Sequence, residues 1–316
     1  MNNKVALIGF YFGKLPNYFP LWLENAKQND DFTFIIYTDD KTQMNYPQNV
    51  IAKYVSFQEL VDKAQRLYDF PICVPYPYKF CDFRPAFGDI FSNDLIGFDF
   101  WGTIDLDIIL GQINHFITDE ILDKYDKVLT RDHFVLYRNT KEVNAHYRGE
   151  QGLGREFYKK VFTSPEIFAF GERAPGGVYH IWKYNGWKMY DVSICADINI
   201  WYNHFEINGD TKKIKKQIFY RNEKGLFRYG ELQGQLVKDE WLYMHLQKRQ
   251  MEYSGDCGNM YFIVPNRFEG ALNSDDISKN MIEIIRKYNG WKVFYGDYER
   301  LALKALKKLR KMWKRL

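Results

Sequence analysis

Two aspartates separated by a single residue interrupt an apolar stretch about one third of the way along the chain. Asp105 and Asp107 follow the largely apolar residues 98–104, which include Asp99, and the apolar run resumes at 108–110. Alternate residues of an extended chain project to the same side about 6 to 7 Å apart, so the two carboxylates can converge on one cation. Carboxylate oxygens suit Mg²⁺ or Mn²⁺, and a cation held in this way can bind a diphosphate. The alternative is a turn or a salt-bridged strand end, but the apolar context favours a metal site, because a carboxylate in such surroundings is costly unless paired or metal-bound.

Two basic residues precede the aspartates in one short segment. Lys79 and Arg84 would neutralise a bound diphosphate, the arginine through a two-pronged hydrogen-bonding group and the lysine as a point charge. The same spacing allows another interpretation, in which they pair with Asp82 and Asp89 on the surface of a helix. Sequence alone leaves both interpretations open.

Apolar runs near the N-terminus predict the buried strands of an α/β sheet. The runs are residues 4–12, 32–38 and 50–55. A helix begun by Pro20 is expected over residues 21–26, and another after Ser56, whose spacing to Glu59 is that of a capping box. Further along, a helix is expected to end at Ile96, and residues 98–111 predict one buried strand that carries both aspartates.

The ends of the first two strands predict a ligand-binding cleft. In an open α/β sheet, ligands bind beyond the carboxyl ends of the strands. This places Phe10, Phe12, Thr38 and Asp39 in the expected cleft as donor-binding residues. The sequence has neither Gly-x-Gly-x-x-Gly after the first strand nor Gly-x-x-x-x-Gly-Lys-Ser/Thr anywhere, so dinucleotide dehydrogenases and P-loop enzymes lose their main support.

The order of these motifs resembles that of bacterial polysaccharide glycosyltransferases of the GT-A fold, over about residues 4–268. The resemblance rests on a Lys-x-x-Asp-x-Arg-Pro segment at 79–85, on Asp105-Leu106-Asp107 and on His-Leu-Gln-Lys-Arg at 245–249. It implies a nucleotide-diphosphate sugar donor, taken as a UDP-sugar, and a divalent cation, Mn²⁺ or Mg²⁺, held by the two aspartates. It further implies a glycan acceptor, either a surface (capsular) polysaccharide or a lipid-linked glycan.

The resemblance makes His245 a third metal ligand. Its spacing to Trp241 and Met244 predicts one face of a helix, and a lone histidine on such a face is more often a hydrogen-bonded core residue. Lys248 is expected to contact the donor phosphates, with Arg249 beside it. The neighbouring acids offer both of these cations a solvated salt-bridge alternative.

An acid in a later loop is the candidate general base. In inverting enzymes of the resembled fold, such an acid removes the proton from the acceptor hydroxyl. Glu172, in a turn-rich loop, takes this position here, although the usual Asp-Glu pair is replaced by Gly171-Glu172. Asp191 is the second catalytic candidate, Asp197 a reserve one, and a plain loop glutamate is the alternative.

Aromatic residues make up 18% of the 316 residues, a richness that suits either a core or the stacking of flat ligands. Most of them must be core. Trp101, Trp182 and Trp187 are the tryptophans assigned to a sugar or base. The four cysteines are widely spaced and form no Cys-x-x-Cys pair, which indicates reduced thiols rather than a zinc or redox motif.

The net charge of +4 is unevenly distributed. The last 17 residues contain eight basic residues and no acidic one, which leaves the rest of the chain slightly acidic. A slightly acidic body argues against the broad basic face of a dedicated nucleic-acid-binding protein. Apolar residues recur in the tail at three- and four-residue steps, so residues 300–316 predict a basic amphipathic helix that contacts an anionic membrane surface. Packing of this helix on the body is the alternative.

These observations predict one α/β domain with a mixed, mainly parallel central sheet and a helical C-terminal extension. The GT-A-like domain is expected over 1–270, with a nucleotide-binding half over 1–112 and an acceptor half over 113–270, followed by the extension at 271–316. The N-terminus does not resemble a secretory signal, so a cytoplasmic, peripheral membrane enzyme is expected. A nucleotide-sugar pyrophosphatase or nucleotidyltransferase and a non-catalytic glycan-binding protein remain the alternatives.

Overall fold

The chain folds into two compact units, seen here in a computed structural model. Unit 1 comprises Met1–Leu106 and Asn114–Ser193, and unit 2 comprises Asp107–Ile113 and Ile194–Leu316. The structure describes residues 1–149, 156–247, 249–255, 257–270, 280–291, 293–297, 300, 302 and 304. The units do not coincide with the expected halves on either side of residue 112, because the chain enters unit 2 at Asp107, returns to unit 1 at Asn114 and leaves it again after Ser193.

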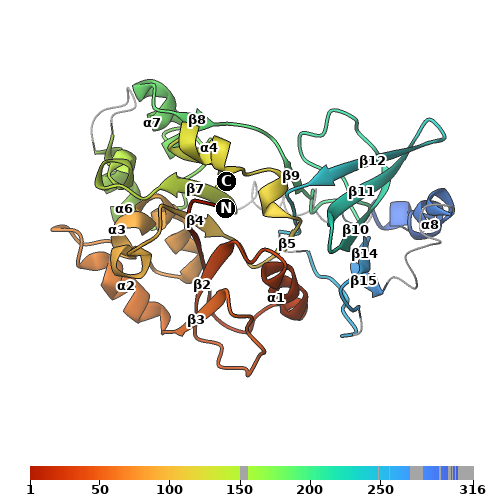
Figure 1. The fold of residues 1–316 in the computed structure, drawn as a ribbon, viewed down its shortest axis with the longest axis horizontal. Coiled ribbons are helices and arrows are strands. Elements are labelled where there is room, and N and C mark those ends of the chain that lie inside the picture. Colours follow the sequence, from red (N-terminus) through yellow and green to blue (C-terminus); the bar gives the residue numbers. More distant parts are fainter. Residues whose placement is uncertain are drawn as a thin grey trace, which may run out of the picture. The chain divides into compact units, whose positions relative to one another are not determined.

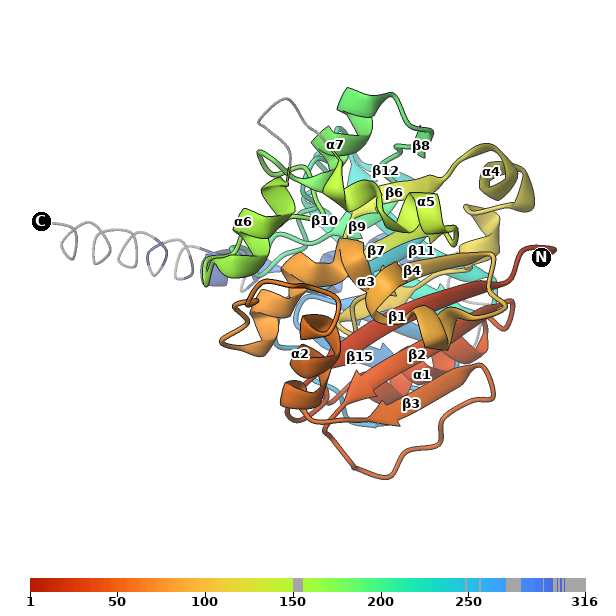
Figure 2. The same ribbon diagram turned by 90° about the vertical axis from the view of Figure 1, so that its left-hand side faces the viewer.

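Unit 1 is built on a seven-stranded sheet with the order β3-β2-β1-β4-β7-β6-β8. Its strands are β1 (Val5–Tyr11), β2 (Phe32–Thr38), β3 (Val50–Tyr54), β4 (Phe100–Ile104), β6 (Lys127–Arg131), β7 (Phe134–Arg138) and β8 (Met189–Tyr190). The pairings β1–β2, β2–β3, β1–β4 and β6–β8 are parallel, and only β7 runs against its neighbours β4 and β6. Figure 2 shows β3, β2, β1 and β4 side by side. The predicted mixed, mainly parallel sheet is confirmed.

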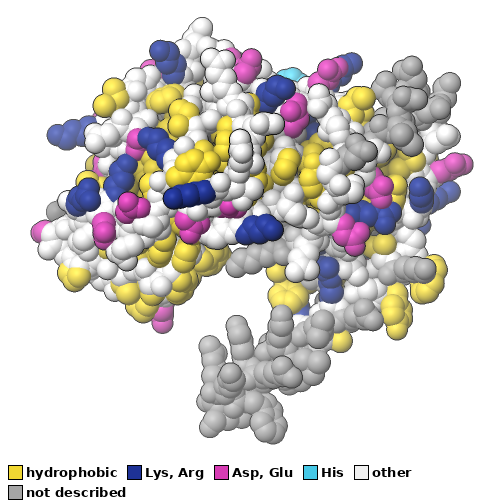
Figure 3. Space-filling view, turned by 90° about the horizontal axis from the view of Figure 1, so that it is seen from below, with side chains coloured by type: hydrophobic (Ala, Val, Ile, Leu, Met, Phe, Trp, Pro, Cys, Tyr) yellow, Lys and Arg dark blue, Asp and Glu magenta, His cyan; other side chains and the backbone are white. Residues whose placement is uncertain are grey.

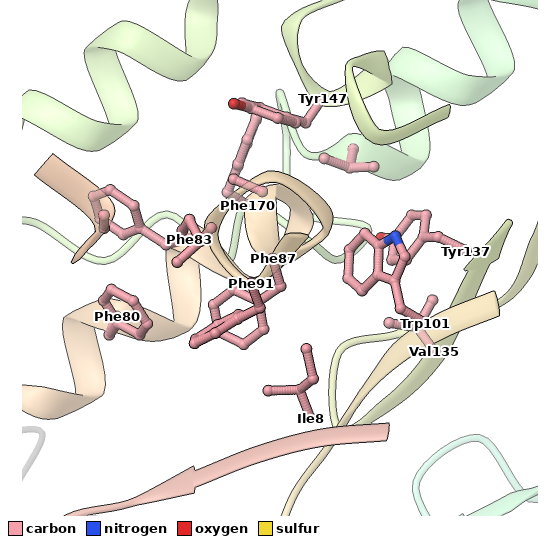
Figure 4. Packing of buried hydrophobic residues seen from close by; sticks show 14 of the residues in the cluster. Ile8, Phe80, Phe83, Phe87, Phe91, Trp101, Val135, Tyr137, Tyr147 and Phe170 are labelled. Atoms are coloured by element: carbon pink, nitrogen blue, oxygen red, sulfur yellow. The ribbon is translucent and has the colours of Figure 1, made fainter. Parts of the chain in front are cut away.

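Both faces of this sheet are covered, which explains why its first strands are apolar throughout. Ile8 on one face packs into a cluster of aromatic side chains that includes Phe80, Phe87 and Trp101 (Figure 4). On the other face Trp22 contacts Phe34 with ring centroids 5.4 Å apart. Alternate residues of each strand therefore meet apolar partners on opposite sides.

Short helices surround the sheet of unit 1. They are α1 (Phe19–Lys27), α2 (Phe57–Gln65), η1 (Pro77–Ala86), α3 (Phe87–Ile90), η2 (Ser92–Leu95), α4 (Asp119–Lys124), α5 (Lys141–Asn144), η4 (His146–Arg148), α6 (Phe157–Thr163) and α7 (Val178–Asn185), and η3 (Ile113–His115) lies where the chain returns to this unit. The capping box of α2 is confirmed, since Ser56 Oγ accepts the Glu59 N–H and Glu59 accepts the Ser56 N–H. Instead of one helix ending at Ile96, the structure has three short segments, η1, α3 and η2.

The prediction of a single strand over residues 98–111 is wrong. The chain forms β4 in the sheet of unit 1 and then β5 (Ile108–Leu110), which pairs with a strand of unit 2. The two strands are separated by residues 105–107, which lie outside any strand. The two aspartates thus follow the end of one strand and precede the start of another, because apolar residues on either side are buried in different sheets.

Unit 2 contains two sheets (Figure 1). A three-stranded sheet has the order β5-β13-β9, with β9 (Cys195–Asp197) and β13 (Tyr243–His245). A five-stranded antiparallel sheet consists of β12 (Gln235–Trp241), β11 (Gly225–Leu232), β10 (Lys216–Asn222), β14 (Tyr261–Val264) and β15 (Arg267–Gly270). Helix α8 (Met281–Tyr288) packs on this sheet through Met281 and Ile285, which contact Ile218 and Tyr220.

The surface carries charges of both signs. On the side shown in Figure 3, lysine and arginine side chains are interspersed with aspartates and glutamates. This distribution agrees with the near balance of charge outside the C-terminal tail. Among the residues that the structure describes, no helix combines the length and the apolar composition needed to cross a bilayer.

Candidate functional site

Three of the predicted donor-binding residues come together beyond the carboxyl ends of β1 and β4. Arg84, at the end of η1, forms an ion pair with Asp105, directly after β4. Its guanidinium lies 5.5 Å from the ring centroid of Phe10 in β1. The side chain of Arg84 is about nine-tenths buried, so its planar group is held in one orientation by an acid and an aromatic face. Asp89, its alternative partner, pairs instead with Arg148.

Lys79 pairs with Asp82, as the alternative interpretation expected, but the pair lies in the interior rather than on the surface of a helix. Its side chain is fully buried, and Nζ donates to Asp82 Oδ2 at 2.8 Å and to the backbone carbonyls of Val161 and Glu166. All three N–H groups therefore have acceptors among the described residues, and the expected diphosphate contact is not available in this conformation. Asp82 in turn accepts the backbone N–H groups of Phe168 and Phe170, both at 3.0 Å. The pair holds the segment that leads to Glu172.

The other predicted cleft residues shape the turns after β1 and β2. Asp39 is exposed and its Oδ1 accepts the N–H of Gly13 at 2.7 Å. Gly13 has φ +89°, which only glycine adopts readily. Thr38 is fully buried, and its hydroxyl accepts the N–H of Asp40. Phe12 is partly buried and contacts Phe57 of α2.

The two catalytic candidates, Glu172 and Asp191, lie in separate segments of unit 1. Glu172 lies in the loop between α6 and α7, where a loop was expected. The residue after it, Arg173, forms an ion pair with Asp191, and Asp191 also accepts a hydrogen bond from Thr130 at 3.4 Å. Asp191 is therefore held by a cation on the same loop as Glu172.

Asp132 is the acid that sequence reasoning missed. It lies in the turn between β6 and β7 and is buried, and its Oδ1 has no hydrogen-bond partner among the described residues. Burial, opposed by the charge of Arg84 and reinforced by that of Glu172, raises the pKa of Asp132 to about 7. The one signal in the sequence is an acid between two apolar strands, the same kind of signal that singled out Asp105.

The strand that leads to Asp132 is irregular. The register of β6 against β7 shifts between Val128 and Arg131, and Leu129 has φ 68°, which is rare for a residue with a side chain. Such a bulge bends a strand and redirects the side chains after it. Lys127, at the start of β6, is fully buried over the ring of Tyr137, and burial lowers its pKa to about 7.

Unit 2 brings together a second group of predicted residues. His245 lies in strand β13 rather than in the expected helix, because β13 pairs with β5 on one side and with β9 on the other. Its Nε2 is 3.5 Å from Asp107 Oδ1, and its Nδ1 is 3.0 Å from Asp197 Oδ1. The imidazole nitrogen and the carboxylate oxygen that lie 3.5 Å apart are close enough to contact one divalent cation.

Two cations follow His245 closely in the sequence. Lys248, predicted to contact the donor phosphates, lies outside the described residues. Arg249 is buried and donates to the backbone carbonyls of Asn203 at 2.8 Å and Asn199 at 3.1 Å. It organises a loop of unit 2 rather than a phosphate site.

The start of the basic tail contacts unit 2. Arg300 donates to the carbonyls of Ile200 and Tyr202, and Lys304 lies 4.7 Å from the ring centroid of Trp201. The contacts of these two cations agree with the alternative prediction, in which the tail packs on the body. Residues 305–316 lie outside the described part of the chain.

Two of the three predicted ligand-stacking tryptophans are in the core. Trp101 and Trp182 are fully buried. Trp101 stacks on Tyr137, as Figure 4 shows, and donates to Asn144. Trp187 stacks on His146 with ring centroids 3.5 Å apart. The aromatic richness of the chain serves packing at these positions.

A groove of about 1300 Å³ lies away from these groups. It is formed by one side of α1 and the segment 43–49 of unit 1. Its lining includes none of the predicted site residues and combines apolar side chains, such as Leu23 and Met44, with polar ones, such as Glu24 and Asn49. The Arg84–Asp105 ion pair and Asp132, whose pKa is raised, lie instead at the ends of the strands of unit 1.

The chain was compared with protein families, with curated proteins and with solved structures. Residues 7–271 match the family model described as "Family of unknown function (DUF6625)". No curated protein matches the chain. Among solved structures, the glycosyltransferase GlyE of Streptococcus pneumoniae TIGR4 is 10% identical with a TM-score of 0.31, over 61% of this chain and 46% of that chain. The match spans less than half of that glycosyltransferase, and a score this low carries no argument about this chain.

Proposed function

The chain belongs to DUF6625, a family of unknown function, and from its own residues we propose that it is a metal-dependent glycosyltransferase of the GT-A type. The donor would be a nucleotide-diphosphate sugar, in the first place a UDP-sugar. The acceptor would be a glycan, either a bacterial surface polysaccharide or a lipid-linked one. The observation that carries the proposal is the 3.5 Å approach of His245 Nε2 to Asp107 Oδ1 in unit 2.

Three features support a cation at this place. Asp107 and His245 are far apart in the sequence, yet strand pairing between β5 and β13 brings them together. A carboxylate is a ligand that suits Mn²⁺, and an imidazole nitrogen is a common ligand of divalent transition metals. Asp105, two residues before Asp107, is expected from its spacing in the sequence to supply a further carboxylate. When bound, the cation would neutralise charge that develops on the departing diphosphate.

Other side chains would act on the donor and the acceptor. Arg84 would hold diphosphate oxygens through its two-pronged guanidinium, since it is oriented by Asp105 and Phe10. Its charge would stabilise the leaving group. Glu172 would remove the proton from the acceptor hydroxyl, and Asp191, which is ion-paired with Arg173, is the second candidate for this role.

Thermal unfolding with and without ligands tests the proposal. UDP and Mn²⁺ together should raise the midpoint of unfolding, because a ligand at about 100 times its dissociation constant adds about 2.7 kcal/mol to the stability of the folded chain. Either one alone should raise the midpoint less. Asp107→Asn and His245→Ala should each abolish the shift. Asp62→Asn, an exposed aspartate on α2, serves as the matched control and should keep it.

Product analysis separates transfer from the related reactions. With a UDP-sugar, Mn²⁺ and an acceptor, a transferase releases UDP and extends the glycan. A pyrophosphatase would release UMP and a sugar phosphate. A glycan-binding protein would release neither and would bind glycan in the presence of a chelator, which would overturn the proposal.

We also propose that the C-terminal tail brings the enzyme to an anionic membrane surface, at its cytoplasmic face. Six of the eight basic residues of the tail lie beyond residue 304. Upstream of them, Trp291 and Tyr295 are 73% and 61% exposed. Exposed aromatic side chains next to cations are typical of segments that lie in a membrane interface. A tethered enzyme would suit a lipid-linked acceptor.

A further inference from the structure

We infer that Asp197 is a positioning residue, which fixes the ring orientation and the tautomer of His245 so that Nε2 is the metal-binding atom. The inference rests on the proposed metal site. It gives Asp197 a role different from that of the reserve general base suggested by its place in the sequence. It concerns residues of unit 2 alone.

The carboxylate of Asp197 is held from both sides. Its Oδ1 lies 3.0 Å from His245 Nδ1 and accepts a second hydrogen bond from Gln247 Nε2 at 2.8 Å. Its Oδ2 accepts a hydrogen bond from Asn208 Nδ2 at 3.1 Å. Asp197 is only 7% exposed. A buried carboxylate with these donors has little freedom to turn away from the imidazole.

The backbone keeps the two residues opposite one another. His245 and Asp197 are partners in the parallel pairing of β13 with β9, and the Ile198 N–H donates to the His245 carbonyl at 3.1 Å. The Asn208 N–H donates to the Asp197 carbonyl at 2.8 Å. On the other side of β13, the Leu246 N–H donates to the Asp107 carbonyl at 3.0 Å. The order acid, imidazole, acid is therefore fixed by the sheet.

Hydrogen-bond chemistry decides the tautomer. An ionised carboxylate only accepts, so the imidazole nitrogen that faces Asp197 must carry a proton. In a neutral imidazole the other nitrogen, Nε2, then holds the lone pair, and Nε2 is the atom that faces Asp107. Metal-binding histidines are commonly oriented by a carboxylate in this way, and loss of that carboxylate weakens metal binding about 10- to 100-fold.

Nuclear magnetic resonance of the metal-free, full-length chain tests the inference directly. With ¹⁵N-labelled histidine, long-range proton–nitrogen spectra report which ring nitrogen carries the proton, and His245→Gln assigns the signal. We expect the Nδ1–H tautomer in the wild type and a mixture of tautomers in Asp197→Ala. Mn²⁺ binding, followed by electron paramagnetic resonance of the free ion, should weaken about 10- to 100-fold in the same variant.

Two further variants guard against a purely structural effect. Asp197→Asn retains an oxygen that can accept from Nδ1, so it should keep the tautomer and lose less Mn²⁺ affinity than Asp197→Ala. Gln247→Ala removes a second donor to Oδ1 and should leave the tautomer unchanged. Unfolding midpoints without metal show whether each variant is folded.

The outcomes separate this inference from the proposed function. If Asp197→Ala is folded and keeps both the Nδ1–H tautomer and Mn²⁺ affinity within twofold of the wild type, Asp197 does not position His245. If the wild type shows the Nδ1–H tautomer, controlled by Asp197, but binds no Mn²⁺, the proposed metal site fails while the tautomer assignment stands.

Discussion

Gly171 is packed directly against the carboxylate of Asp132, and a Cβ atom at this position would lie 1.7 Å from Asp132 Oδ2. The close approach explains why glycine stands at 171, next to Glu172. It also places the backbone of the loop that carries Glu172 against Asp132, a buried acid that sequence reasoning did not find. The packing of this loop is therefore open to a direct test.

Gly171→Ala should destabilise the protein by about 1 to 3 kcal/mol, the usual cost of forcing an extra methyl group into a packed interior. Chemical denaturation measures the loss. Gly290→Ala is the matched control, because a Cβ there meets only the Lys287 carbonyl at 3.9 Å. Adding Asp132→Ala should recover part of the stability, and an equal loss with or without Asp132 would contradict the packing argument.

Asp132→Asn should stabilise the protein more at pH 8 than at pH 5. Burial raises the pKa of Asp132 from 3.8 to about 7, so between these values the folded chain holds a proton that the unfolded chain releases. The contribution of Asp132 to stability is therefore present at low pH and is lost as the pH rises through this window. Asparagine does not titrate, so the Asp132→Asn variant does not lose this stability as the pH rises.

Unfolding midpoints of Asp132→Asn and of the wild type, compared across this pH range, check the sign. The gain at pH 8 should amount to a few degrees. Asp62→Asn, on an exposed part of α2, provides the control. A gain that is the same at both pH values would mean that Asp132 is ionised throughout.

Lys79→Met should cost about 3 to 5 kcal/mol, because it leaves the Asp82 carboxylate buried without its cation. Lys79→Met with Asp82→Asn should be more stable than Lys79→Met alone, since no charge is then left unpaired. Denaturant titrations give both values. A Lys79→Met variant that is as stable as the wild type but no longer binds UDP would restore the diphosphate role expected from the sequence.

Arg84→Lys should weaken the binding of UDP with Mn²⁺ at least about tenfold, although it keeps the positive charge. Lysine lacks the planar pair of donors and does not stack on Phe10 as a guanidinium does. Calorimetry with UDP and Mn²⁺ measures the change, with the exposed Arg66→Lys as the control. Wild-type affinity in Arg84→Lys would argue against a contact between Arg84 and the donor.

Removal of residues 305–316 should lower binding to anionic vesicles by at least about tenfold, because it deletes six cations that each contribute up to about 1 kcal/mol near such a surface. Flotation with phosphatidylglycerol vesicles, at two salt concentrations, measures the loss. Neutral phosphatidylcholine vesicles are the control. Equal binding of the full-length and shortened chains would assign any membrane contact to another part of the protein.

Local patterns predicted the N-terminal elements well. The strands β1, β2 and β3 and the capping box of α2 follow from apolar runs and from one short-range spacing, and each is confirmed. The helix expected around His245 is wrong because helical spacing of apolar residues is also compatible with a short buried strand. Pairing with β5 and β9, more than forty residues away in the sequence, decides between the two.

The sequence by itself determined the chemical types available: the Asp105-x-Asp107 pair, Arg84 and His245, and an α/β sheet whose buried strands leave their ends for ligands. Only the tertiary structure decided their partners. It paired Lys79 with Asp82 in the core, set Asp132 against Gly171, and placed Asp197 behind His245. The physical reason is that burial and hydrogen bonding between residues distant in sequence, which no local pattern encodes, determine whether a charged side chain supports the fold or remains available to a ligand.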